Sequence, residues 1–551
     1  MPETPDSATT EQKPTVAVVG LGGMGLVTVK NLLEEGFRVT GFDRSAYVGG
    51  LWHFSEDPET LSVLENTVAN VTTDRGCFTD YPFPPGTPIY PSAKQVEAYL
   101  ESYADHFNLR PHLRLGTGVE KVLRDDDGDS DDAGRRQWRL RLQDGREERF
   151  DKVVVATGPH AQPTMPEFEG REEFAGEVLH SKAFKRPEEY RGKRVLLVGL
   201  GNTTGDVADS LVGVADSVYI AHNHGAYVFS RHINGSPTSR LLTQRRQSIQ
   251  ALLERWFPGY TEGLVNKKAR ALMRATQGEL DPAWGLEPCP SMRVTVPVVS
   301  DTLVSHLRSG AVRSVPGVRR LRAPSTVELL RGGEELEGVD VVICCTGFRN
   351  DYSILSSSDG GRFDPSADPP PEWLRTPGSR GRPLPRLYQN VFSLEAPDSL
   401  AFVGSVWFAT GAFFVADMAS MCIAQVWAGK AQLPPRGRME AWADGHARGV
   451  VRLAEERGAA PLPAAVSAGE WLAWADETAG TGLIARTGWG WKGWVFWARR
   501  RRLWRMVVDG PLTSAAWRLF DEGRRRPWEA AEGVIERVNE EAAREAAGRQ
   551  R

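Results

Sequence analysis

Residues 15–25, TVAVVGLGGMG, decide the fold of this chain. The apolar, β-branched run at 15–20 predicts a buried strand, and the glycines that follow it precede a helical stretch that continues to about Glu35. A second strand at 37–43 ends in Asp43, which lies 23 positions after Gly20. This order of strand, glycine loop, helix, strand and acid predicts a dinucleotide-binding βαβ unit.

Each residue of this pattern has a physical role. We expect Gly20 to make the tight turn after the strand, Gly22 to let a pyrophosphate approach the backbone, and Gly25 to let the helix pack closely against the strand. The N-terminus of the helix stabilises phosphate charge. Asp43 is expected to accept a hydrogen bond from a ribose hydroxyl.

The same pattern recurs at residues 193–199, KRVLLVG. A threonine, Thr204, stands at the third glycine position and predicts slightly looser packing of helix against strand. The run at 222–224, His-Asn-His, stands where an acid would repel a 2′-phosphate, which favours NADPH without excluding NADH. The candidate residues of this second cofactor site are Gly199, Gly201, Asn202, Thr203, Thr204, His222 and His224.

Two further apolar runs, VVVATG at 153–158 and VVICCTG at 341–347, end in Thr-Gly. Fully apolar runs are typical of buried parallel strands, and such ends bring the chain back beside a dinucleotide. The candidate residues here are Thr157, Gly158, Thr346 and Gly347. The duplicated pattern as a whole predicts an α/β fold with two nested Rossmann-like domains, and the usual chemical reason for two dinucleotides is hydride transfer from a nicotinamide to a flavin.

Composition excludes several other classes of protein. The 551 residues are 25% charged and 41% hydrophobic, which is ordinary for a globular chain, and the net charge of −4 disfavours a general nucleic-acid binder. The five cysteines contain no CxxC, so we expect neither a disulfide framework nor a zinc site, and a reducing, cytoplasmic location is favoured. His222 and His224 alone are too few for a metal site.

Two segments resemble membrane elements. The seventeen uncharged residues 400–416 are too short for a span and contain two glycines, so we interpret 400–404 as a buried strand that leads through a loop into a helix at 417–428. Residues 486–505 mix tryptophan with arginine and fit either a membrane or partner surface, or tryptophans packed on the main body. The second interpretation is favoured, because no long amphipathic helix pattern is sustained there.

Beyond the glycine loops, three stretches resemble the flavin-containing monooxygenases. These are Gly49-Gly50-Leu51-Trp52, then Asn70 with the downstream run 78–83, FTDYPF, and finally 174–184, which fits the pattern FxGxxxHxxx(Y/F). The related Baeyer–Villiger monooxygenases carry Trp-Pro at the end of the last pattern, whereas this chain has Phe184-Lys185. The resemblance therefore favours oxygenation of a heteroatom, with Baeyer–Villiger oxygenation of a ketone as the alternative.

The polar, proline-containing residues 1–13 predict a disordered tail, and an amphipathic pattern predicts a helical insertion at about 236–285. Together with the resemblance, the repeated pattern assigns the first part of an FAD-binding domain to 14–172 and an inserted NAD(P)H-binding domain to 173–334. The second part of the FAD domain, with a C-terminal helical segment, is assigned to 335–551. The run 417–421, DMASM, lacks the glutamine and arginine of the family, which indicates a different pocket.

The resemblance also implies a chemistry: NADPH reduces FAD, dioxygen adds at flavin C4a, and the terminal oxygen passes to an amine nitrogen or a thioether sulfur. Asn70 is the candidate polar group beside the oxygenating species, Gly50, Leu51 and Trp52 are candidates for flavin contact, and Asp80 for an anchor under the flavin. His180 is expected to link the domains, and His222 and His224 to be weak phosphate partners. A homodimer is compatible with the sequence. A flavin disulfide reductase is disfavoured by the missing CxxC, and a flavoprotein module that docks to membranes stays open.

Overall fold

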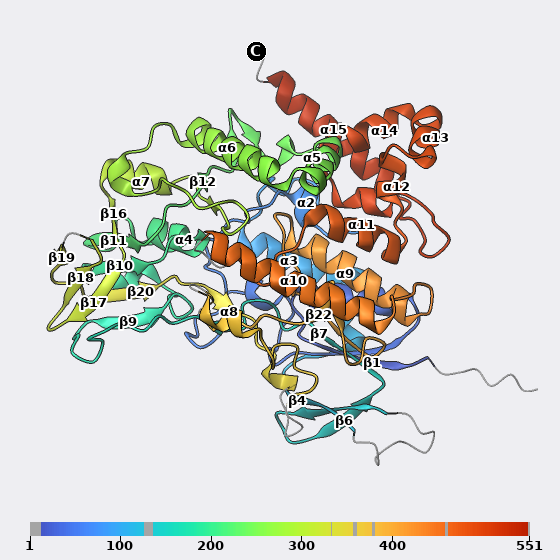
Figure 1. Cartoon of the computed structure of the whole chain (residues 1–551), viewed down its shortest axis with the longest axis horizontal. Helices are drawn as coiled ribbons and strands as arrows, with labels where there is room; N and C mark the ends of the chain where they lie inside the picture. Colours follow the sequence, from blue (N-terminus) through green and yellow to red (C-terminus); the bar gives the residue numbers. More distant parts are fainter. Residues whose placement is uncertain are drawn as a thin grey trace, which may run out of the picture.

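A computed structural model of the chain describes residues 13–125, 136–331, 333–355, 361–376, 379, 381–457 and 461–548. Residues 1–12 of the predicted N-terminal tail lie outside these ranges. The described residues form a mixed α/β structure with two sheets side by side, the first mixed and the second parallel, and a group of helices that covers the first of them (Figure 1).

The first sheet has the strand order β22-β23-β24-β7-β1-β2-β3. The strand β1 (Thr15–Val19) lies between β2 (Arg38–Phe42) and β7 (Lys152–Val155), and all three are parallel. The helix α1 (Gly23–Glu34) connects β1 to β2, as the glycine pattern predicts. The sheet is completed on one side by β3 (Leu113–Arg114) and on the other by β24 (Leu400–Phe402), β23 (Phe392–Ser393) and β22 (Leu387–Tyr388).

The second sheet repeats this topology with the order β16-β11-β10-β20-β9, all parallel. Its strands are β9 (Glu177–His180), β10 (Arg194–Val198), β11 (Ser217–His222), β16 (Val312–Pro316) and β20 (Val341–Cys344), and α4 (Asn202–Leu211) follows β10. The fold is thus two nested Rossmann-like units, since the first sheet takes strands from both ends of the chain and the second only from its middle.

One predicted boundary needs correction. We expected the second unit to end at residue 334, but β20 pairs with both β10 and β9 and belongs to the second sheet. A fully apolar strand carries no mark of which sheet it joins, so the sequence could not decide this point. We propose that the second unit extends to about Gly347, where the chain returns to the first unit.

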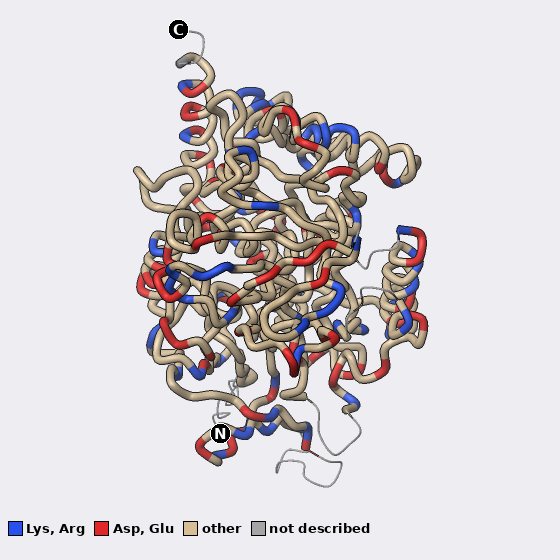
Figure 2. Tube along the Cα trace, turned by 90° about the vertical axis from the view of Figure 1, so that its left-hand side faces the viewer, with Lys and Arg blue, Asp and Glu red and all other residues tan. Residues whose placement is uncertain are grey.

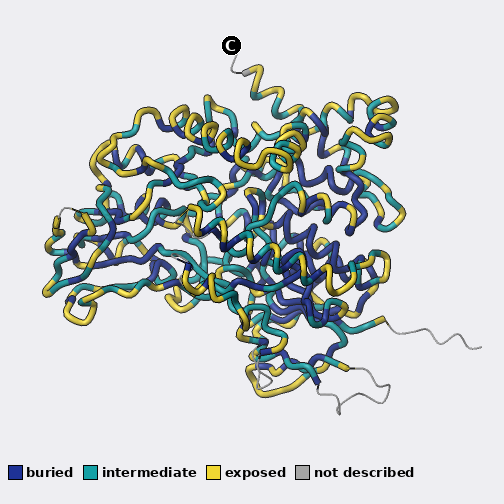
Figure 3. The backbone as a smooth tube through the Cα atoms, viewed as in Figure 1, coloured by how far each residue is buried: buried dark blue, intermediate teal, exposed yellow. Residues whose placement is uncertain are grey.

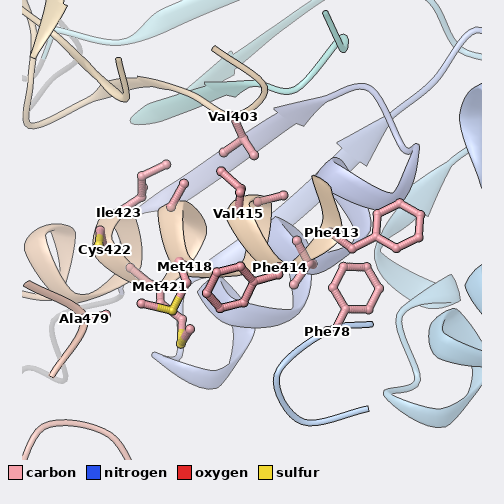
Figure 4. Packing of buried hydrophobic residues seen from close by; sticks show 14 of the residues in the cluster. Phe78, Val403, Phe413, Phe414, Val415, Met418, Met421, Cys422, Ile423 and Ala479 are labelled. Carbon is pink, nitrogen blue, oxygen red and sulfur yellow. The ribbon is translucent and has the colours of Figure 1, made fainter. Parts of the chain in front are cut away.

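A long buried helix, α9 (Ala412–Trp427), packs against α1 and forms the centre of the largest core. It begins five positions earlier than the helix predicted at 417–428, directly after its N-cap Gly411. Figure 3 shows the buried residues concentrated around the first sheet and this helix. In Figure 4 the side chains of α9 from Phe413 to Ile423 lie in this core, and Phe413 approaches Phe78 with 5.2 Å between ring centroids.

Helices from three parts of the chain pack around the two units (Figure 1). The predicted helical insertion forms α5 (Gln244–Trp256) and α6 (Pro258–Gln277), and α10 (Arg436–Arg457) lies across the front of the first sheet in this view. The C-terminal part consists of α11 (Ala468–Ala479), α12 (Leu483–Thr487), α13 (Trp491–Arg499), α14 (Arg501–Val508), the 3-10 turn η7 (Ser514–Arg518) and α15 (Ala531–Gly548).

The tryptophan- and arginine-rich segment 486–505 is packed only in part. Phe496 and Leu503 are buried, but Trp489, Trp491 and Trp494 are 78%, 73% and 57% exposed. The favoured expectation that these tryptophans pack on the main body is therefore wrong for three of them. None of the described helices is long and apolar enough to cross a membrane. In Figure 2, basic and acidic residues are interspersed along the chain.

Candidate active site

The first glycine loop has the shape that its sequence predicts. Gly20 has a φ of +99°, and a Cβ atom there would stand 2.5 Å from the carbonyl oxygen of Ala156 in the neighbouring strand end. A Cβ atom on Gly25 would stand 1.8 Å from the carbonyl oxygen of Gly20, so helix and loop touch at this point. No described side chain caps α1 at Gly22, and its first turn contains no acid. The free N–H groups of this helix end fit a pyrophosphate.

Asp43 lies at the carboxyl end of β2 beside this loop. Its Oδ2 atom accepts a hydrogen bond from the N–H of Leu21 at 2.7 Å, and its Oδ1 atom accepts one from Ser45 at 2.8 Å. These bonds fix the carboxylate at the edge where the adenosine ribose of a dinucleotide is bound in this kind of unit.

The segment Gly50–Trp52 forms a short 3-10 turn, η1, against the same loop. Gly49 pairs with Gly22, and a Cβ atom on Gly50 would stand 3.0 Å from the Cα of Gly22. The ring of Trp52 lies 6.3 Å from that of Phe413 at the start of α9. The turn that carries Leu51 and Trp52 therefore packs against the first glycine loop, and the ring of Trp52 reaches the N-terminus of α9.

The second glycine loop follows β10 and differs from the first at one position. Gly199 has a φ of +110°, and a Cβ atom on Gly201 would meet no other atom within 4 Å, which leaves room for a ligand at the N-terminus of α4. Thr204 is buried, and its hydroxyl donates to the Gly199 carbonyl at 3.0 Å and accepts from the Gly201 N–H at 3.3 Å. The threonine thus replaces the close glycine contact by hydrogen bonds within the loop.

The other two candidates of this loop, Asn202 and Thr203, differ in what surrounds their side chains. The side chain of Asn202 donates to the Pro297 carbonyl at 3.3 Å and accepts from the Val299 N–H at 2.8 Å. It therefore ties α4 to the strand β15 (Val298–Val299). Thr203 is exposed at the first turn of α4.

Both Thr-Gly pairs lie where the chain crosses between the units. Gly158 and Gly347 have φ values of +86° and +84°, and a Cβ atom on either would meet no atom within 4 Å, so both sites leave space for a ligand. Thr157 is exposed, whereas the Thr346 hydroxyl donates to the Thr164 carbonyl.

His180 links the crossing segments. Its Nε2 atom bonds the Gly347 carbonyl at 3.0 Å, and its Nδ1 atom accepts from the Lys182 N–H at 3.1 Å. Burial lowers the pKa of this imidazole, so it is neutral near pH 7. With both ring nitrogens bonded to backbone, His180 has a linking role and no free atom for proton transfer.

The two histidines after β11 are in different environments. The Nδ1 atom of His222 bonds the His224 carbonyl at 2.9 Å, and its Nε2 atom bonds the Ser314 hydroxyl at 2.8 Å. Burial lowers the pKa of His222, so its cationic form is reached only at more acidic pH than for a free histidine. His224 is exposed. Of the two, His224 has the ring that is free to approach a phosphate.

Asn70 is held at the junction of the two units by an arginine that the sequence did not indicate. The Asn70 Oδ1 atom accepts a hydrogen bond from Nη2 of Arg231 at 2.8 Å. The same guanidinium donates to the carbonyls of Val68 at 2.9 Å and Ala69 at 3.2 Å. Because its carbonyl side is occupied, the amide group of Asn70 presents its NH₂ side as a hydrogen-bond donor.

A pair of parallel strands positions this arginine. β12 (Val228–Phe229) pairs with β15, and Arg231 and Asp301 follow the two strand ends. Asp301 accepts from the Arg231 backbone N–H and from its Nη1 atom, both at 2.9 Å. Arg231 is buried, so the ion pair and the bonds to 68–70 fix the second unit against the segment that carries Asn70.

Asp206 makes a second contact between the units. It accepts a hydrogen bond from the Thr67 hydroxyl at 3.2 Å. Burial raises the pKa of Asp206 to about 6, although the Thr67 bond and the charge of Arg231 act in the opposite direction. The carboxyl group is therefore mostly ionised at neutral pH and titrates in the mildly acidic range.

Asp80 has a different surrounding from the one expected. Its buried carboxylate pairs with Lys30 in α1 and with Arg518 at 2.8 Å. Lys30 lies seven residues after Gly23, roughly 10 Å along the helix from the end that faces the glycine loop. Asp80 thus belongs to an ion-pair cluster that joins α1 to the C-terminal segment, and its contact with a flavin stays a prediction.

Sequence patterns found the two loops but missed Arg231 and Asp301. Arg231 lies 161 residues after Asn70, and neither it nor Asp301 belongs to a motif with a recognisable spacing. Only the pairing of β12 with β15 brings them to the site.

Residues 13–360 match the family model described as flavin-binding monooxygenase-like. Monooxygenase aurF of Gibberella zeae is 42% identical over 532 residues, which cover 96% of this chain and 97% of aurF. Human flavin-containing monooxygenase 3 is 32% identical over 352 residues, which cover 62% of this chain and 63% of the human protein.

Solved structures show the same fold at lower identity. The S-allyl-L-cysteine S-oxygenase of Allium sativum superposes with a TM-score of 0.59 at 19% identity and covers 97% of this chain and 99% of its own. Cyclohexanone monooxygenase, in an open crystal structure, gives a TM-score of 0.58 at 18% identity, with 86% of this chain and 98% of that chain covered. At these identities the likeness concerns the fold alone.

Proposed function

The chain belongs to the flavin-binding monooxygenase-like family, and we propose that it transfers one atom of O₂ to a nucleophilic nitrogen or sulfur of a small molecule. As a member of this family it is an NADPH-dependent flavin oxidoreductase with FAD and NADPH as cofactors. The reaction balances as substrate, O₂, NADPH and H⁺ giving the N- or S-oxide, NADP⁺ and H₂O; for a primary or secondary amine the oxide is the hydroxylamine.

One observation supports this proposal most: Asn70 stands where the two units meet and is held by Arg231 of the second unit. The first glycine loop, with Asp43, would hold FAD, and the second loop, with Gly201 at the N-terminus of α4, would hold NADPH. When bound, NADPH supplies a hydride and the reduced flavin with O₂ supplies the oxygen atom. A neutral amide donor at the junction can hydrogen-bond an oxygen atom there without introducing a charge.

The choice of nitrogen or sulfur over a ketone rests on Phe184-Lys185, which stand where Baeyer–Villiger enzymes carry Trp-Pro. Three compounds with one phenyl ring test it: N,N-dimethylaniline, thioanisole and acetophenone, each incubated with the FAD-loaded enzyme, NADPH and O₂. We expect the N-oxide and the sulfoxide by mass spectrometry. Phenyl acetate from acetophenone as the main product would instead establish the ketone reaction.

Replacing Asn70 by alanine is expected to lower product formation about 100-fold, as for loss of one positioned donor in an active site. NADPH oxidation is expected to continue and to yield hydrogen peroxide, because the cofactor loops are unchanged. Product and peroxide are measured against NADPH consumed.

Asn66→Ala is the matched control for this prediction. Asn66 lies on the same segment, and its side chain donates to the hydroxyl of Ser210 at 3.0 Å on the exposed surface. Its variant should keep the wild-type ratio of product to NADPH. An unchanged ratio in Asn70→Ala would remove Asn70 from the reaction.

A further inference from the structure

A cavity that is open to solvent on one side lies next to α2 (Thr73–Gly76) and the start of α9. Its apolar wall comes from separate elements that lie far apart in the sequence, five of them helices. The wall residues are Phe408, Phe414, Leu472, Leu483, Val507 and Ile535. Most of these elements lie after residue 360, where the match to the family model ends.

Two buried polar side chains line this apolar cavity. Arg75 is 8% exposed, and its Nη2 atom donates to the Ala409 carbonyl at 3.5 Å and to the Thr410 hydroxyl at 3.3 Å. Thr513 is 6% exposed, and its hydroxyl has no hydrogen-bond partner among the described residues. Buried polar groups are normally paired, so an unpaired hydroxyl in a cavity wall indicates a ligand group.

The charge of Arg75 also lacks a partner in the described structure. The neighbouring carboxylate, Asp74, pairs with Arg240 at 2.8 Å, and no described carboxylate lies within 4.0 Å of the Arg75 guanidinium. Burial lowers the pKa of Arg75 to about 10, so the group remains a cation at neutral pH. A buried cation in an apolar wall is costly unless an anion or a strong acceptor meets it.

The cavity lies close to the candidate active site. A Cβ atom on Gly411, the N-cap of α9, would stand 2.4 Å from the Arg75 carbonyl oxygen, so α2 and α9 are in direct contact. On another side of the same helix end, a Cβ atom on Gly23 would meet the ring of Phe413, which faces Phe78 in Figure 4. One turn of α9 therefore separates the cavity from the first glycine loop.

We propose that this cavity binds the substrate, and that the substrate is an apolar, ring-containing compound with an acidic oxygen, such as a carboxylate or a phenolate, that accepts hydrogen bonds from Arg75 and Thr513. The inference that a compound bound in this cavity is oxygenated rests on the proposed function. The inference that the cavity binds such a compound can be tested by binding alone. Arg75 acts as a specificity-determining residue, because a planar guanidinium binds an oxyanion more strongly than a neutral carbonyl.

Binding of 2-naphthoate and of its neutral analogue 2-naphthamide to the FAD-loaded enzyme tests the site by calorimetry. We expect Arg75→Met to weaken naphthoate binding about 10- to 100-fold and naphthamide binding less than about 3-fold. Thr513→Val should weaken naphthoate binding by a smaller factor. Arg246→Met removes the same charge from the exposed surface of α5 and should change neither affinity.

Stability separates binding from a structural role of Arg75. A structural role predicts a lower melting temperature for Arg75→Met and equal losses for both ligands, and that result would overturn the proposal. Equal affinities of both ligands for wild type and Arg75→Met would overturn it as well. The proposal expects an unchanged or higher melting temperature, because a buried cation without a partner is removed.

The pair 4-(methylthio)benzoate and 4-(methylthio)benzamide connects the site to the reaction. We expect sulfoxide from both, with a KM for the acid at least about 10-fold lower and a preference that Arg75→Met abolishes. If the acid binds through Arg75 and no sulfur is oxygenated, the site stands and the proposed function fails. If both are oxygenated without discrimination, the function stands and this inference fails.

Discussion

Replacement of Gly25 by alanine is expected to give a folded protein without its yellow colour. The added methyl carbon would stand 1.8 Å from the carbonyl oxygen of Gly20, and this contact is with backbone, so no side chain can turn away to relieve it. The start of α1 must then move off the loop, and the N–H groups that face the pyrophosphate move with it. We expect FAD content below about a tenth of wild type after gel filtration, measured by absorbance at the flavin band.

Gly445→Ala provides the matched control. Gly445 lies on the exposed face of α10, where a Cβ atom would meet nothing within 4 Å, so the change should keep full FAD content and leave stability equal or slightly higher. A stoichiometric flavin in purified Gly25→Ala would show that the first loop is not the FAD site. Circular dichroism that differs strongly from wild type would show instead that the contact is needed for folding.

The two glycine loops could be predicted from sequence because their information is local. Each loop lies within about 30 residues, and each glycine is explained by a contact inside its own βαβ unit. Thr204 shows the limit of this reasoning even there. The pattern predicts looser packing at a threonine, whereas the structure adds that its hydroxyl bonds both Gly199 and Gly201.

The rest of the site depends on contacts between distant parts of the chain. Arg231 reaches Asn70 across 161 residues, and the cavity beside Arg75 receives its walls from helices after residue 400. Loop and helix residues of this kind follow no period in the sequence, so their side-chain directions were not predictable. The same holds for β20, whose apolar sequence fits either sheet.

Asp80 was predicted as a site residue from a motif, but other contacts determine its position in the structure. The stretch around it resembles a family motif, but its carboxylate meets Lys30 of α1 and Arg518 of the C-terminal segment. The side chains of all three are at most 8% exposed. Burial alone would raise the pKa of Asp80, but the charges of Lys30, Arg518 and Arg525 outweigh it and lower the pKa to about 2. The carboxyl group of Asp80 is therefore ionised at neutral pH and loses its charge only in strong acid.

Asp80→Ala is accordingly expected to destabilise the protein by about 3–5 kcal/mol, the usual effect of removing one partner from a buried ion pair. Two buried cations lose their shared anion, and among the described residues only Lys30 keeps a second carboxylate within 4.0 Å, Glu34 at 2.6 Å. Because Arg518 connects the C-terminal helices to α1, we expect limited proteolysis to remove the segment after about residue 518 faster than in wild type. Thermal unfolding of the holoenzyme should begin roughly 3–5 °C lower, because in a chain of this length 1 kcal/mol shifts the midpoint by only about 1 °C.

Asp144→Ala is the control, since Asp144 pairs with Arg146 at 2.7 Å on the surface and its side chain is 49% exposed. An exposed pair contributes at most about 1 kcal/mol, so this variant should melt within about 2 °C of wild type. If Asp80→Ala melts as late as Asp144→Ala but loses FAD, the carboxylate acts on the flavin, as the family resemblance implies. If it melts early and the remaining folded fraction keeps FAD, its function is to fasten the C-terminal helices, and with them much of the wall of the cavity beside Arg75, to the first Rossmann unit.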